Sequence, residues 1–159
     1  MLKTLAAAGA LALGLTFTSA ASAQTYLTDW GVADMKAAIV AAGGTVQSDG
    51  TLDDGNPYVA AKSSGGLKYT VSGRVCEGAA GAKRCKGALL ETRFTLDSDA
   101  EVEAQIKKLD YAAVSILNGG EGDLLLSRYL ILDYGIHRDN LEINLSVFTG
   151  IAEAVWDTL

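Results

Sequence analysis

The chain has 159 residues, of which 49% are hydrophobic and 20% are charged, and its formal net charge is −6. This length suits one domain with one hydrophobic core, and the composition excludes an extensively disordered chain. The acidic balance excludes a protein that binds nucleic acid through a general excess of positive charge. We therefore expect no nucleic-acid partner.

The first 23 residues, "MLKTLAAAGALALGLTFTSAASA", have the order of a secretory signal peptide. Lys3 is the only charge, an apolar run covers residues 5–17, and small residues lead up to Ala23. A membrane anchor is the alternative, but a spanning helix needs about 20 apolar residues and this run is shorter. We expect cleavage after Ala23, no remaining transmembrane anchor, and a periplasmic or secreted protein. Residues 24–159 then form a single domain whose 12 basic and 19 acidic residues give a net charge of −7.

The segment that follows predicts one helix and two strands. Val32, Met35 and Ile39 recur at helical spacing in "TDWGVADMKAAIVAAGG", and the two glycines at its end are typical of a helix terminus. Residues 45–66, "TVQSDGTLDDGNPYVAAKSSGG", indicate two short strands around a turn rich in Asp, Gly and Asn.

Residues 67–75 and 87–96 alternate between apolar and polar side chains, which predicts a β-hairpin. If Cys76 lies opposite Cys85, Val71 faces Leu90 and the apolar faces of the two strands coincide. Exported thiols tend to pair, a zinc site needs four ligands, and a thioredoxin-like centre has only two residues between its cysteines. We therefore predict a disulfide between Cys76 and Cys85, on the outward face of the sheet.

The second half predicts a helix, another hairpin and a long final helix. Ser98 and Glu101 have the spacing of a capping box, and residues 112–135 indicate two strands that turn at residues 118–122. The final helix begins near Asp139. Its apolar stripe consists of Leu141, Leu145, Phe148, Ile151, Ala152, Val155 and Leu159.

The predicted fold is α+β, with the order α-β-β-β-α-β-β-α and an antiparallel sheet of about five strands that helices cover on one side. The first and third helices should pack on the sheet through Ile39, Phe148 and Val155. Their predicted partners in the sheet are Leu67, Val71, Leu90 and Phe94.

Three segments together with the leader resemble the YbjN-domain family. They are "YLTDWGVADMKAAIVAAGG" near the start of residues 24–159, "SRYLILDYGI" before the last helix, and "LEINLSVFTGIAEAVWDTL" at the end. The resemblance spans nearly all of residues 24–159 and implies a fold similar to type III secretion chaperones. It also implies no established enzymatic activity and a loose association with sensory or stress regulation, which for an exported chain would be envelope stress or sensory regulation. The leader and the cysteine pair distinguish this chain from the cytoplasmic chaperones of that fold.

Four cations crowd the tip of the predicted stapled hairpin: Arg74, Lys83, Arg84 and Lys86. One interpretation is a solvated loop, and the other is contact with an acidic partner or a lipid headgroup, because a rigid projecting tip concentrates charge. We treat the four residues as the candidate partner-binding surface, and we expect an anionic partner if they are the site. The exposed sheet edge and the groove between the first and third helices are the alternatives.

Other polar residues fit ordinary structural roles better than chemistry. His137 is the only histidine, at a junction between strand and helix, and neither Asp53–Asp54 nor Glu121 with Asp123 has the ligand spacing of a calcium loop. No phosphate-binding glycine motif is present, so we expect no metal and no cofactor. We expect a non-catalytic, chaperone-like module that holds a protein or peptide, with a small envelope hydrolase as the alternative and both monomer and homodimer left open.

Overall fold

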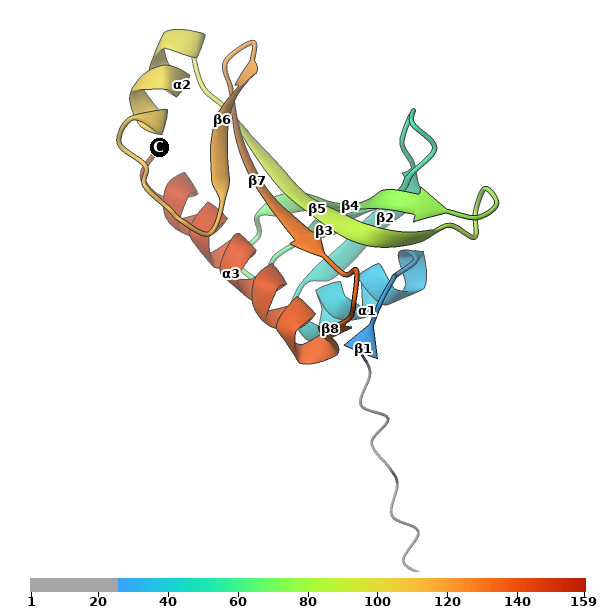
Figure 1. The fold of residues 1–159 in the computed structure, drawn as a ribbon. Helices are drawn as coiled ribbons and strands as arrows, with labels where there is room; N and C mark the ends of the chain where they lie inside the picture. The colour runs from blue at the N-terminus through green and yellow to red at the C-terminus, as the bar shows by residue number, and fades with distance from the viewer. Residues whose placement is uncertain (1–25) are drawn as a thin grey trace, which may run out of the picture.

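The computed structural model describes residues 26–159, so the predicted signal peptide lies outside the described part of the chain. Three helices and eight strands follow one another along these residues (Figure 1). In chain order they are β1 (Tyr26–Leu27), α1 (Val32–Ala41), β2 (Thr45–Thr51), β3 (Pro57–Lys62), β4 (Lys68–Glu77), β5 (Arg84–Thr95), α2 (Asp99–Ile106), β6 (Ser115–Gly120), β7 (Asp123–Ile131), β8 (Ile136–His137) and α3 (Arg138–Trp156).

The main sheet has six antiparallel strands in the order β2-β3-β4-β5-β7-β6, and β1 pairs with β8 in a separate two-stranded sheet. Figure 1 shows α1 and α3 on one side of the main sheet and α2 beside β6 at its far end. The other face of the central strands carries no helix. Within residues 26–159 no helix is both long and apolar enough to cross a membrane.

The α+β class and the antiparallel sheet are confirmed, and the predicted element order is wrong in detail. Four strands of the main sheet precede α2 where the predicted order has about three, because both short strands predicted in residues 45–66 form complete strands beside the two strands of the hairpin. The strands β1 and β8 were not predicted. Each has two residues, which is too short to leave a recognisable alternation of apolar and polar side chains.

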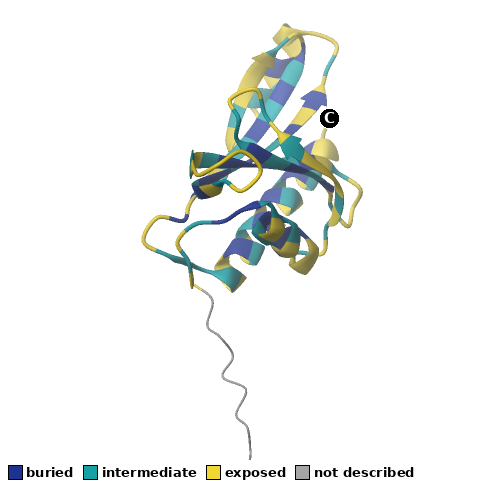
Figure 2. Cartoon of the chain, turned by 90° about the vertical axis from the view of Figure 1, so that its right-hand side faces the viewer, coloured by how far each residue is buried: buried dark blue, intermediate teal, exposed yellow. Residues whose placement is uncertain are grey.

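The hydrophobic core lies between the sheet and the helices α1 and α3, and Figure 2 shows buried residues on these facing surfaces. Val71, Leu90 and Phe94 are buried as predicted. Leu67 is only partly buried, because it ends the tight turn in which the Ser63 N–H donates to the Leu67 carbonyl. The helices contribute the buried residues Met35, Ala38, Ile39, Leu141, Leu145, Phe148, Ala152 and Val155.

The predicted register of the stapled hairpin is confirmed. Cys76 lies opposite Cys85, and Val71 lies opposite Leu90. The predicted start of the second helix is also confirmed, since the Ser98 hydroxyl accepts a hydrogen bond from the Glu101 N–H (3.3 Å). A capping side chain of this kind satisfies one of the free N–H groups of the first turn.

Candidate functional site

The candidate site is the hairpin tip, residues 74–86, where β4 turns back into β5. Cys76 and Cys85 form a disulfide there, with their Cα atoms 3.9 Å apart, and the described residues contain no free cysteine. Cys85 is fully buried and exchanges two backbone hydrogen bonds with Trp30, at 2.8 and 3.0 Å. The disulfide therefore joins the two strands of the tip, and Trp30 joins the tip to the segment before α1.

The prediction that the disulfide lies on the outward face of the sheet is wrong. Val75 has a left-handed backbone with φ of 53°, which interrupts the alternation of β4, so that Val75 is 62% exposed and Cys76 turns toward the core. A Cβ on Gly73 would lie 2.3 Å from the Cys85 Sγ, so the sulfurs occupy the space that a side chain at position 73 would fill. Gly73 and Ala88 face each other across the strands and leave this room.

Arg84 fastens the tip to the N-terminal segment. Its Nε and Nη2 donate to the Asp29 carboxylate at 2.9 and 2.7 Å, and its Nη1 donates to the Asp34 carboxylate at 2.6 Å. The hydrogen bond to Asp29 is the main cause that raises the pKa of Arg84. Asp34 also accepts the N–H of Gly31 at the start of α1 (3.1 Å). Arg84 thus has a structural role that links the tip, the N-terminal segment and the first helix.

Two of the other cations also have acidic neighbours. Arg74 lies 3.9 Å from carboxylate oxygens of both Asp54 and Glu91, and Lys86 lies 3.8 Å from Glu77. These three long contacts are worth little each, because solvent screens them. They nevertheless reduce the positive charge that Arg74 and Lys86 present to a partner.

Lys83 is the exception among the four. Within residues 26–159 its ammonium forms no ion pair. It lies over the turn between β2 and β3, where a Cβ on Gly55 would be 3.1 Å from the Lys83 Nζ. In that turn the backbone N–H of Asn56 donates to Asp54 and lowers the pKa of the Asp54 carboxyl, and the charges of Arg74 and Lys83 lower it further.

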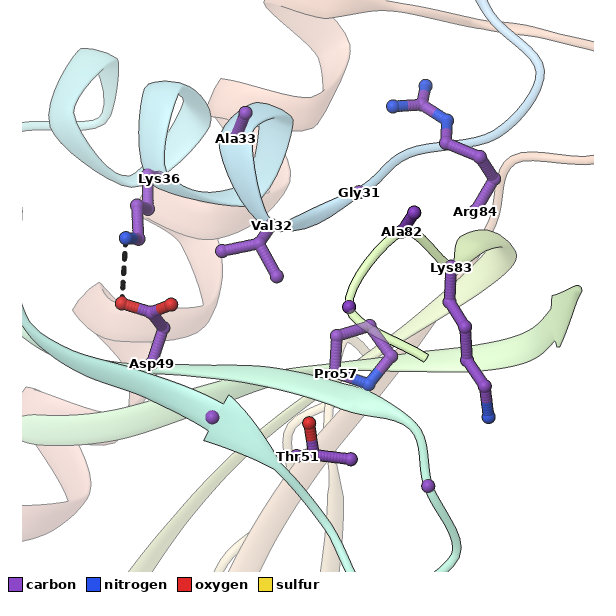
Figure 3. A pocket seen from close by; sticks show the side chains of 13 residues that line it. Gly31, Val32, Ala33, Lys36, Asp49, Thr51, Pro57, Ala82, Lys83 and Arg84 are labelled. Atoms are coloured by element: carbon purple, nitrogen blue, oxygen red, sulfur yellow. Dashed lines mark ion pairs between the residues drawn. The ribbon is translucent and has the colours of Figure 1, made fainter. Parts of the chain in front are cut away.

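A surface cavity of about 530 Å³ lies beneath the tip, between the start of α1 and the ends of β2 and β3 (Figure 3). Lys83, Ala82 and Arg84 line it from the tip, and Val32 lines it from α1. On the opposite wall Lys36 and Asp49 form an ion pair of 2.7 Å. The predicted tip residues Lys83 and Arg84 therefore share one cavity, whereas Arg74 and Lys86 do not line it.

The remaining candidates occupy structural positions. The His137 Nδ1 accepts the N–H of Asp139 (3.3 Å) at the start of α3, and Glu121 has a φ of 56° in the turn between β6 and β7. Asp123 lies at the start of β7 and forms an ion pair with Arg93 (3.4 Å). In the described part of the chain no three His, Cys, Asp or Glu residues are grouped so that they could bind a metal ion.

Asp29 and Asp34 were missed by the sequence reasoning. They lie 55 and 50 residues from Arg84, and no spacing rule connects residues so far apart in the sequence. The only local signal was that both carboxylates flank the start of a predicted helix, where negative charge is favourable.

No protein-family model, curated protein or solved structure matches this chain. The resemblance to the YbjN-domain family consequently rests on the sequence segments alone.

Proposed function

We propose that this protein is an exported, non-catalytic binding module that holds an acidic protein or peptide at the cavity beneath the hairpin tip. The observation that carries the proposal is the position of Lys83, a cation with no ion pair among residues 26–159, at the wall of a cavity of about 530 Å³. A carboxylate of the partner would form the ion pair that Lys83 lacks.

Preorganisation supports this assignment. The disulfide joins both strands of the tip, and Arg84 ties the tip to Asp29 and Asp34. A loop that is already ordered loses less conformational entropy when a partner binds. Arg84 would then contribute by holding Lys83 in place, while Arg74 and Lys86 would act through the longer-range field of the tip.

Export is supported by two independent features. The first 23 residues have the composition of a signal peptide, and a disulfide persists in the oxidising compartments outside the cytoplasm. The resemblance to the YbjN-domain family supports a chaperone-like role in envelope stress or sensory regulation. A periplasmic or secreted binding protein agrees with the signal peptide, the disulfide and the family resemblance.

A crosslinking pull-down from envelope extracts tests the proposal, with Lys83→Glu as the variant and Lys107→Glu as the control. Both substitutions change the charge by the same amount, and Lys107 is exposed directly after the end of α2. We expect capture to fall with added salt and with Lys83→Glu, but to remain with Lys107→Glu, because exposed charges act over about 8 Å at physiological ionic strength. If the partner is captured equally by both variants, and equally at low and high salt, the binding site does not lie at the tip.

A further inference from the structure

A second cavity, of about 460 Å³, lies at the C-terminal end of α3 and shares no lining residue with the cavity beneath the hairpin tip. It lies where β4 and β5 stop pairing. The last pair is Thr70 opposite Glu91, although β5 continues to Thr95. Its volume is within the range of about 300 to 1,000 Å³ that is usual for small-molecule sites. The cavity therefore suits a small ligand.

Trp156 gives this cavity a flat aromatic wall. The ring centres of Trp156 and Phe94 lie 5.5 Å apart, and the ring planes are inclined by 33°. Phe94 is buried in the core, whereas Trp156 is 60% exposed, so the core supports the indole from one side and leaves much of its surface open. An aromatic side chain of this kind offers a large rigid contact surface, because few torsion angles must be fixed when a ligand binds.

Charged side chains of both signs surround Trp156. Glu153 on the last turn of α3 and Asp157 directly after it are four residues apart, a spacing that places them on the same side of the helix. Lys68 from β4 and Arg93 from β5 line the same cavity. These two negative and two positive charges cancel. A ligand with a net charge of either sign would therefore meet repulsion as well as attraction.

The Glu153 carboxylate is held in place by the turn between β3 and β4. The Ser63 hydroxyl donates to this carboxylate and accepts the N–H of Leu67 (3.0 Å). Gly65 leaves room for the carboxylate, since a Cβ at position 65 would lie 2.5 Å from the Glu153 Oε1. This acceptor is therefore positioned before a ligand binds.

Lys68 and Asp157 keep free hydrogen-bonding groups in the cavity. Both are exposed, and within residues 26–159 neither forms an ion pair. Arg93, by contrast, pairs with Asp123 at 3.4 Å. An ammonium group only donates hydrogen bonds and a carboxylate only accepts them. A ligand that fills the cavity must consequently offer both acceptors and donors without a net charge.

A sugar ring combines these properties. Its hydroxyl groups each donate and accept hydrogen bonds, and the C–H bonds on one face of the ring form an apolar surface that can lie flat on an indole. Hydrogen bonds between hydroxyls and charged side chains are of the stronger kind. We propose that this cavity binds a neutral saccharide, with one face of a sugar ring on Trp156 and its hydroxyls bonded to Glu153, Asp157 and Lys68. The inference concerns a site separate from the tip and does not rest on the proposed function.

Saturation-transfer difference NMR on the protein tests this inference with three neutral probes: cellobiose, maltose and N,N′-diacetylchitobiose. Glucuronate and phenylalanine serve as an anionic and a zwitterionic comparison. We expect saturable binding of at least one neutral disaccharide, with the strongest saturation on the C–H protons of one ring face. The same sugar should protect Trp156 from quenching by acrylamide, and Trp30 does not obscure this signal because it is fully buried.

Variants at the cavity separate binding from folding. Trp156→Ala should weaken saccharide binding about tenfold or more, because the stacking surface is lost. Tyr134→Ala is the matched control, since Tyr134 is a 98% exposed aromatic residue outside the cavity, and it should change the affinity less than about twofold. Asp157→Ala should weaken binding about tenfold, and Asp157→Asn less, because the amide oxygen still accepts a hydrogen bond. The melting temperature should change little in all four variants, as for exposed residues.

Three outcomes would overturn the inference: no saturable binding of any of the three disaccharides, equal losses in Trp156→Ala and Tyr134→Ala, or tighter binding of glucuronate or phenylalanine than of every disaccharide. Lys83→Glu should leave saccharide binding unchanged. If Lys83→Glu removed saccharide binding while Trp156→Ala did not, the sugar would bind beneath the tip and the site at the end of α3 would be excluded.

Discussion

Gly73→Ala should destabilise the protein because of the disulfide beside it. The new Cβ would lie 2.3 Å from the Cys85 Sγ and 2.9 Å from the Cys76 Sγ. Neither sulfur can move far, since Cys85 is fully buried and its backbone is held by two hydrogen bonds to the backbone of Trp30. Overpacking of this kind costs about 1 to 3 kcal/mol. This overpacking cost is larger than the roughly 0.5 to 1 kcal/mol by which Ala is favoured over Gly within a strand.

A double-mutant cycle with Cys76→Ala and Cys85→Ala isolates this clash. Without the sulfurs, a contact of 3.2 Å to the Cβ of residue 85 remains, and a shift of a few tenths of an ångström relieves it. We expect Gly73→Ala to be neutral or stabilising in that background, so that the coupling energy is about 1 to 3 kcal/mol. Urea denaturation followed by circular dichroism measures the four free energies of unfolding.

Gly150→Ala is the matched control for the cycle. Gly150 is exposed on α3 and has no atom within 4 Å of an added Cβ. This substitution should stabilise the protein by up to about 1 kcal/mol with or without the disulfide, through helix propensity alone. An equal cost of Gly73→Ala in both backgrounds would refute the position that we assign to the disulfide.

Four further predictions concern stability. Phe94→Ala should cost about 3 to 5 kcal/mol in urea denaturation, as for a buried aromatic, and a change near zero would contradict its place in the core. Replacing Cys76 and Cys85 by Ala should lower the free energy of unfolding by roughly 2 to 3 kcal/mol while the fold is retained. Stoichiometric thiol labelling of the denatured, unreduced wild-type protein would contradict the disulfide itself. Burial raises the pKa of Tyr69 to about 12, whereas an unfolded tyrosine has a pKa of about 10. The contribution of Tyr69 to the free energy of unfolding should therefore be complete below about pH 10 and decline as the pH rises toward 12. Tyr69→Phe should remove that decline when thermal unfolding is measured at alkaline pH. Arg84→Lys should lower the melting temperature, because one ammonium cannot reproduce the fork of bonds to two carboxylates, and an unchanged value would leave Arg84 without the fastening role.

The fold was largely predictable because its determinants are local or periodic. Val71 and Leu90 lie on apolar faces with a period of two, and pairing Cys76 with Cys85 brings those faces together without further assumptions. Ser98 marks the start of α2 through a hydrogen bond within its own turn. Such signals need no knowledge of distant segments.

The errors have equally specific causes. A left-handed backbone is unfavourable for a β-branched residue, so no rule of sequence places Val75 there, and the predicted face of the disulfide depended on an uninterrupted strand. The cations of the tip were identified as a group, but the carboxylates beside Arg84 come from a segment 50 or more residues away. The sequence therefore located the candidate site without revealing which of its charges are paired.

Site-directed photocrosslinking tests the proposed binding module most directly. A photoreactive amino acid at Ala82, which is exposed at the wall of the tip cavity, is compared with the same residue at Glu103, which is exposed on α2. After export and irradiation in the envelope, we expect position 82 to give a discrete adduct that Lys83→Glu removes, and position 103 to give none. No adduct at position 82, or the same adduct from both positions, would contradict a partner bound at the hairpin tip.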